Sequence, residues 1–150
     1  VRVPDKLKQD IKVVTHSLMN QVASNTKILH EITPRQFEEL VCELFEKEGN
    51  HVELTKQTRD GGKDLIILNN SSLGDFVIYA ECKKRAPKYP VNVGFVRELY
   101  GTVNADNATA GIMVTTSYFS RDARKYQEKI KSRMSLIDYS ELMKRIMACK

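Results

Sequence analysis

The sequence has no tryptophan, only three cysteines and three histidines, and no long apolar run. Cys42, Cys82 and Cys149 are odd in number and far apart, which argues against a disulfide framework and against a zinc site. We therefore expect a reducing, cytoplasmic location. No stretch approaches the roughly 20 apolar residues that span a bilayer, so we expect neither a membrane segment nor a signal peptide.

What is present fits one globular domain of 150 residues. The chain begins with valine, and we expect it to be a piece of a longer protein with a region upstream. The net charge is +5, and residues 83–97 carry five basic side chains and no acidic one. Such a run favours a polyanionic partner, although a solvated basic face is the common alternative.

The pattern of apolar residues and turn formers predicts an α/β fold with a mixed sheet and helices on both faces. Residues 1–32 form a lead of one or two helices that pack on the core. A helix is expected from the Thr33 N-cap to about residue 48, and a last helix from the Ser140 cap to residue 148. Strands are predicted at 52–55, 64–68, 76–83, 110–115 and 134–137, with a hairpin connection of several residues at 69–74. Two further helices begin near residues 92 and 120.

The helix after Thr33 carries one apolar stripe, with acidic residues opposite it. Glu39 and Glu43 are predicted to point to solvent, whereas Glu38 lies at the edge of the buried face. If one of these acids reaches a site at the sheet, geometry selects Glu38.

Side chains alternate along a strand, so Glu81 and Lys83 share one face and Cys82 lies on the other, in the core. A hairpin brings Asp64, at the start of the preceding strand, beside Glu81. Two such carboxylates repel one another unless a cation lies between them, and Mg²⁺ would leave room for water and phosphate oxygens. This set predicts metal-assisted phosphodiester hydrolysis, with the Lys83 ammonium positioning water or stabilising charge.

Glu-x-Lys alone carries little information, because 11 Glu and 15 Lys in 150 residues give about one match by chance. Its common alternative is a cross-strand salt pair on a solvated face. The context of Asp60-Gly61-Gly62-Lys63-Asp64 favours the functional interpretation. Its glycines suit a tight turn and leave backbone amides open.

Five ordered segments together resemble the Mrr-like restriction endonucleases of the PD-(D/E)xK nuclease superfamily, over about Thr33 to Ile146. They are Phe37-Glu38-Glu39-Leu40-Val41, Asp60-Gly61-Gly62-Lys63-Asp64-Leu65-Ile66, Glu81-Cys82-Lys83, Val96-Arg97-Glu98-Leu99-Tyr100-Gly101 and Gly111-Ile112-Met113-Val114-Thr115-Thr116. The resemblance implies a nuclease domain over residues 33–150, with a restriction-endonuclease-like core of about four to five strands.

The resemblance further implies a Mg²⁺-dependent DNA endonuclease, with Mn²⁺ able to substitute. Asp64, Glu81 and the backbone carbonyl of Cys82 would hold the metal, Lys83 would be the catalytic lysine, and Glu38 would support the metal or its water. Many family members carry glutamine where this chain has Glu81. Glutamate is the stronger Mg²⁺ ligand, which argues for activity but weakens any assumption that the substrate is modified DNA.

We expect DNA as the partner, a homodimer for double-strand cleavage, and an upstream DNA-recognition domain. The DNA-binding residues are predicted to be Lys84, Arg85, Lys88, Arg97, Thr115 and Thr116. For the two threonines, simple closure of a strand is an equally good interpretation. The alternative function is a catalytically silent module of the same fold that binds nucleic acid or a protein. The complete set of three acids and a lysine argues against that alternative.

Overall fold

The computed structural model describes residues 18–55 and 62–149. Predictions about the first 17 residues, and about Asp60 and Gly61, lie outside the described residues. In the described part of the lead, residues 18–24 are helical and are followed by a short helix, α2 (Ile28–Glu31). Met19, Val22 and Leu29 are buried in the main core, so this part of the lead packs on the domain as predicted.

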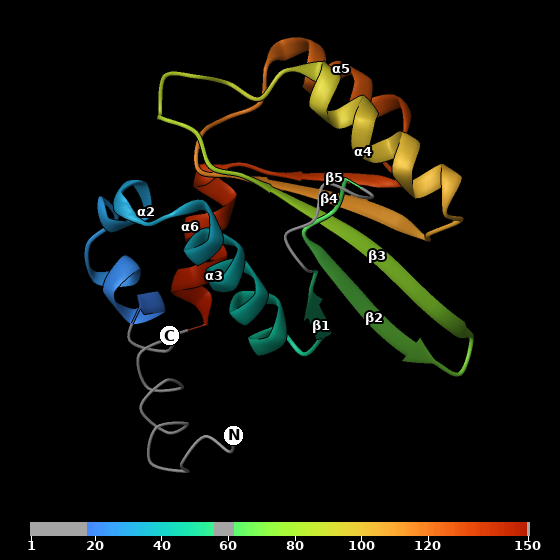
Figure 1. Ribbon diagram of the computed structural model, residues 1–150, viewed down its shortest axis with the longest axis horizontal. Helices are drawn as coiled ribbons and strands as arrows, with labels where there is room; N and C mark the ends of the chain where they lie inside the picture. The colour runs from blue at the N-terminus through green and yellow to red at the C-terminus, as the bar shows by residue number, and fades with distance from the viewer. Residues whose placement is uncertain (1–17, 56–61, 150) are drawn as a thin grey trace, which may run out of the picture.

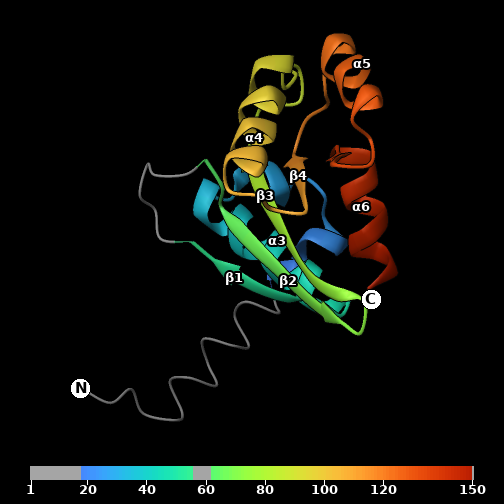
Figure 2. The same ribbon diagram turned by 90° about the vertical axis from the view of Figure 1, so that its right-hand side faces the viewer.

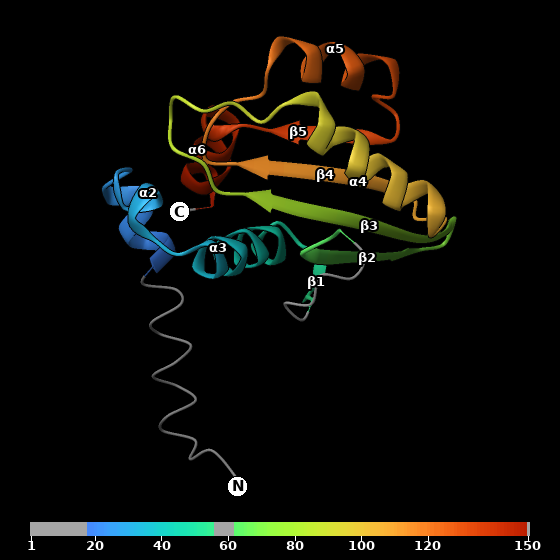
Figure 3. The ribbon, with the colours of Figure 1, turned by 45° about the horizontal axis from the view of Figure 1, so that its top comes forward.

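Five strands form one mixed sheet in the order β1-β2-β3-β4-β5 (Figure 3). They are β1 (His51–Leu54), β2 (Leu65–Ser71), β3 (Gly74–Lys83), β4 (Ala110–Thr115) and β5 (Met134–Ile137). The first three pair antiparallel, and β3, β4 and β5 pair in parallel. Parallel neighbours need long crossover connections, and helices supply them here. The predicted α/β class with a mixed sheet is confirmed.

The helices cover both faces of the sheet (Figures 1 and 2). Besides α2 they are α3 (Pro34–Lys47), α4 (Val93–Ala105), α5 (Arg121–Lys129) and α6 (Tyr139–Ala148). On one face α3 and α6 bury Leu40 and Leu142 in the main core. On the other face α4 and α5 bury Leu99 and Ala123 in a second cluster. The sheet therefore separates two apolar layers, as expected when helices pack on both faces.

Helix α3 begins with the capping box that its sequence predicts. The Thr33 hydroxyl accepts from the Gln36 N–H at 3.1 Å, and the Gln36 side chain accepts from the Thr33 N–H at 2.9 Å. Glu38 is buried at 8% exposure, which fits its predicted place at the edge of the apolar stripe. Glu43 was predicted on the solvent side, but it is equally buried and ion-paired with Lys47 at 3.6 Å.

Two local predictions are wrong. The connection between β2 and β3 is a two-residue turn, because Asn69 and Asn70 continue the ladder opposite Phe76 and Asp75. Gly74 closes the turn with φ +130°, a conformation that side chains disfavour. Helix α6 is capped by Asp138, which accepts from the Glu141 N–H at 3.0 Å, and not by Ser140. No helix in the described ranges is long and apolar enough to cross a membrane.

Candidate active site

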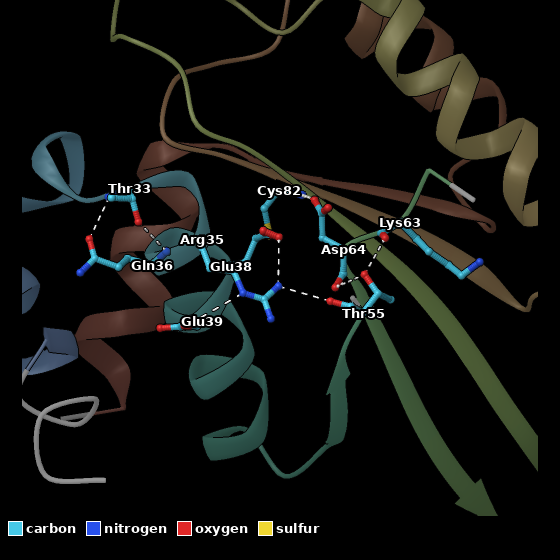
Figure 4. Close-up of polar contacts among 9 residues, drawn as sticks. All are labelled: Thr33, Arg35, Gln36, Glu38, Glu39, Thr55, Lys63, Asp64 and Cys82. Atoms are coloured by element: carbon cyan, nitrogen blue, oxygen red, sulfur yellow. Dashed lines mark hydrogen bonds and ion pairs between the residues drawn. The ribbon is translucent and has the colours of Figure 1, made fainter. Parts of the chain in front are cut away.

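Asp64 lies immediately before β2 and is fixed by backbone and side-chain contacts (Figure 4). Its N–H donates to the Ala80 carbonyl at 2.9 Å, which extends the ladder with β3 by one residue. Its Oδ2 accepts from the Cys82 N–H at 2.8 Å. On the opposite side, the Thr55 N–H donates to the Asp64 carbonyl at 2.9 Å. The carboxylate is therefore held against the last residues of β3.

Glu81 and Lys83 lie on one face of β3, as strand parity predicts. The Lys83 Nζ is 2.9 Å from Glu81 Oε1, and it lies 4.4 Å from the centre of the Phe95 ring on α4. The Glu81 side chain is only 13% exposed and that of Lys83 is 26% exposed. Cys82 lies on the other face and packs against the main core. The ammonium is thus partly desolvated by an aromatic ring while it contacts one acid of the site.

The Cys82 thiol is buried and lies near negative charge. Burial raises the pKa of its thiol well above the usual value, and the negative charges of Asp64, Glu38 and Glu81 raise it further. The thiol is therefore unreactive at neutral pH. The hydrogen bond from the Cys82 N–H to Asp64 places the acid at the start of β2 beside the end of β3.

Burial also raises the pKa of the two strand acids. For Asp64 the increase is opposed by the Cys82 N–H and by the charges of Lys83 and Arg35. For Glu81 it is opposed by the hydrogen bond and charge of Lys83, while the charges of Asp64 and Glu98 add to it. A pair of partly buried acids that repel one another is the environment that a bound cation stabilises.

Arg35 completes the α3 side of the site, and the sequence analysis missed it. Its Nη1 lies 3.6 Å from Glu38 Oε1 and donates to the Thr55 carbonyl at 3.3 Å. Its Nε is 3.9 Å from Glu39, which points away from the sheet (Figure 4). Spacing of three between Arg35 and Glu38 on one helix is the signal that could have indicated this pair.

The donor set suits a hard, weakly ligated cation. Among the described residues, no group of three or more His, Cys, Asp or Glu is arranged to hold a metal ion. Glu38 is accordingly near Asp64 and Glu81 without forming a third ligand with them. Mg²⁺ commonly takes one or two carboxylates and keeps several waters, so the Asp64 and Glu81 pair fits it. A closed structural zinc site would need more and softer ligands.

Three of the predicted DNA-binding residues make contacts inside the protein. The Thr115 and Thr116 side chains are buried, and their hydroxyls donate to the carbonyls of Lys83 and Arg85, each at 2.7 Å. They hold the end of β3 and are not available for phosphate. Lys84 Nζ donates to the His30 carbonyl at 3.0 Å, so it ties the lead to the sheet. The buried hydroxyls correct the expectation that Thr115 and Thr116 bind phosphate, whereas the role of Lys84 in DNA binding stays a prediction.

The other basic candidates lie at the surface or at the site. Arg85 packs 5.6 Å from the Phe95 ring centre, beside Lys83. Lys88 and Arg97 are exposed, and each lies over a tyrosine ring, Tyr89 and Tyr126 respectively. Both retain solvent-facing charge that a phosphate could contact.

The fold is that of a restriction-endonuclease-like domain. The modification-dependent restriction endonuclease AspBHI has a similar structure, with a TM-score of 0.65 and 21% identity over 89% of this chain and 35% of that one. MspJI, solved in complex with a 27-mer oligonucleotide, gives a TM-score of 0.55 and 20% identity over 89% of this chain and 30% of that one. At these identities the likeness shows the fold.

The family model described as restriction endonuclease, the Mrr catalytic type, matches residues 29–146. The chain belongs to this Mrr-like restriction endonuclease family. A curated relative is the type IV methyl-directed restriction enzyme EcoKMrr of Escherichia coli, 26% identical over 144 residues. That alignment covers 93% of this chain and 45% of the relative, so the chain spans less than half of EcoKMrr.

Proposed function

We propose that this chain is the catalytic domain of a Mg²⁺-dependent DNA endonuclease of the type IV restriction class, with Mn²⁺ able to replace Mg²⁺. The observation that carries the proposal is the contact between the start of β2 and the end of β3, where the Asp64 carboxylate accepts from the Cys82 N–H and Lys83 is hydrogen-bonded to Glu81. Membership of a restriction endonuclease family supports a nuclease role on DNA.

Asp64 and Glu81 would hold the cation, with the carbonyl of Cys82 as a third donor. A Mg²⁺ ion bound there would polarise the scissile phosphate and lower the pKa of a coordinated water. If a cation neutralised the two acids, Glu81 would no longer need the Lys83 ammonium as its partner. Lys83 would then be able to donate to the attacking water or to the developing phosphorane charge.

Glu38 and Arg35 act from α3. Glu38 is buried beside the strand acids, where its carboxylate would orient a metal-bound water. Arg35 bonds the Thr55 carbonyl, and Thr55 in turn donates to the carbonyl of Asp64. This chain of contacts links the helix to the backbone that carries the first metal ligand.

Methylated DNA is the first substrate to test, because EcoKMrr is described as methyl-directed. Supercoiled plasmid, methylated or unmethylated, should be incubated with the protein in Mg²⁺, Mn²⁺ or EDTA. The proposal expects nicked or linear product in both metals and none in EDTA. Salt-sensitive DNA binding without cleavage under any condition would instead support a non-catalytic DNA-binding module.

A further inference from the structure

Lys63 precedes the first metal ligand in the chain, yet its side chain turns away from the site toward α4. Its Nζ lies 3.3 Å from Asp106 Oδ2, just beyond the end of that helix, and 4.4 Å from the centre of the Tyr79 ring. The Tyr79 hydroxyl donates to the same carboxylate oxygen at 2.9 Å. The three side chains form one connected contact, here called the Lys63 clamp.

The clamp is more than a loose surface ion pair. The Lys63 side chain is only 17% exposed, and its cation lies on an aromatic face, an arrangement that strengthens when water is excluded. The hydrogen bonds from Tyr79 and Lys63 lower the pKa of Asp106, which favours its ionised form, and the Asp106 side chain is 41% exposed. Side chains from β3, from the segment before β2 and from the end of α4 are joined in this way.

The backbone beside Lys63 is held from both directions. Gly62 has φ +58°, and a Cβ built there would lie 3.2 Å from the Thr102 hydroxyl of α4, so this segment runs close to the helix. From the β1 side, the Thr55 hydroxyl shares its one proton between the carbonyls of Lys63 and Asp64, both at 3.0 Å. The turn that carries Asp64 therefore lies between two anchors.

We propose that Lys63 and Asp106 are positioning residues, which set the Asp64 carboxylate in the orientation that binds the divalent cation. In this proposal neither side chain is a metal ligand or a DNA contact. Removing the clamp leaves the contacts of Asp64 with Thr55, Ala80 and Cys82 in place but loosens the backbone on the Lys63 side, which shifts the carboxylate from its preferred orientation. This inference rests on the proposed function, because it assumes that Asp64 is a metal ligand.

The test measures Mn²⁺ affinity without DNA, by isothermal titration calorimetry, for wild type and for Lys63→Met, Asp106→Asn and the double variant. Outer-shell contacts to metal ligands are typically worth about 10–100-fold in affinity, so each single variant should bind about tenfold more weakly. Because the two residues act as one unit, the double variant should be no weaker than the weaker single variant. Asp106→Asn keeps an acceptor for Tyr79 and is the milder change.

Arg124→Met is the matched control. Arg124 also pairs with an aspartate, Asp138 at 2.8 Å, and lies 5.3 Å from the centre of an aromatic ring, Phe119. It should lose a comparable amount of thermal stability and keep wild-type Mn²⁺ affinity.

The clamp's role would be overturned if Lys63→Met and Asp106→Asn both bound Mn²⁺ within twofold of the wild-type affinity while Asp64→Asn had lost Mn²⁺ binding. An equal loss of Mn²⁺ affinity in Arg124→Met would also overturn the clamp's role, because it would show that the loss comes from general destabilisation. Equal Mn²⁺ binding by wild type and Asp64→Asn would instead overturn the metal site itself, and the clamp's role with it.

Discussion

The carboxylate of Asp64 accepts a hydrogen bond from the backbone N–H of Cys82 at 2.8 Å. This contact joins the start of β2 to the end of β3 and places Asp64 beside the strand that carries Glu81 and Lys83. A backbone donor favours the ionised form of the acid and fixes its direction without using a side chain of the site.

Removing the lysine should separate catalysis from metal binding. Lys83→Met should lower the rate of plasmid cleavage by about 10²–10⁴-fold, the usual range for a group that moves or orients a proton. Mn²⁺ affinity should stay within a few fold of wild type, because Lys83 is no ligand. The exposed Lys144→Met on α6 is the control for charge and should cleave normally. A Lys83→Met protein with wild-type rate would exclude the assigned role.

The two adjacent glutamates of α3 should differ. Glu38→Gln should reduce cleavage by roughly tenfold or more, because it removes a buried carboxylate beside the strand acids. Glu39→Gln should have little effect, since that side chain is 44% exposed and points to solvent. Single-turnover cleavage rates of Glu38→Gln and Glu39→Gln test this difference. Equal rates would show that helix geometry selected the wrong acid.

Neutralising Glu81 should stabilise the metal-free protein at pH 7. Burial raises the pKa of Glu81 in the folded state, so its ionised form costs folding free energy at neutral pH. That cost disappears as the pH falls through the raised pKa, because the folded state then binds the proton first. Glu81→Gln should raise the Tm by up to a few degrees, since about 1 kcal/mol moves a domain of this size by about 2–4 °C.

The difference in Tm between Glu81→Gln and wild type should shrink toward pH 4. In saturating Mg²⁺ the difference should reverse, because the metal stabilises only the protein that binds it. Thermal unfolding in EDTA and in Mg²⁺ at several pH values tests both statements. A Glu81→Gln protein that is less stable than wild type in EDTA at pH 7 would contradict them.

The exposed basic residues should contribute salt-dependent DNA affinity. In EDTA, Lys88→Ala and Arg97→Ala should each reduce the slope of log K against log salt by about one, as expected for one lost phosphate contact. Thr116→Val should weaken the fold without changing the slope, because its hydroxyl bonds the Arg85 backbone. An unchanged slope in both basic variants would place the DNA on another surface.

Much of the fold was predictable because helix starts and the faces of strands depend on residues close together in the sequence. The capping box at Thr33 set the start of α3, and strand parity set the shared face of Glu81 and Lys83. The hairpin was predicted too long, since asparagines favour turns in isolation but here continue a ladder. Turn propensity was outweighed by cross-strand pairing.

Side-chain contacts between distant segments were not predictable in the same way. Arg35 and Lys63 are separated from Thr55 and Asp106 by 20 and 43 positions, so no local pattern indicates those bonds. Burial of Glu43 depends on tertiary packing around α3. Thr115 and Thr116 lie at the end of a strand near the site, which suggested a contact with phosphate. Their hydroxyls instead bind the carbonyls of Lys83 and Arg85, and these bonds depend on the path of the chain after Lys83.

The most direct test is the rate of plasmid cleavage in Mg²⁺ by wild type, Asp64→Asn and the exposed hairpin variant Asp75→Asn. Asparagine can still accept from the Cys82 N–H, so the fold should survive while the charge that holds the metal is lost. Outer-shell changes alone cost about 10–100-fold, so Asp64→Asn should lose more than about 100-fold. Asp75→Asn should keep the wild-type rate. Equal cleavage by Asp64→Asn and wild type would contradict the assignment of this site.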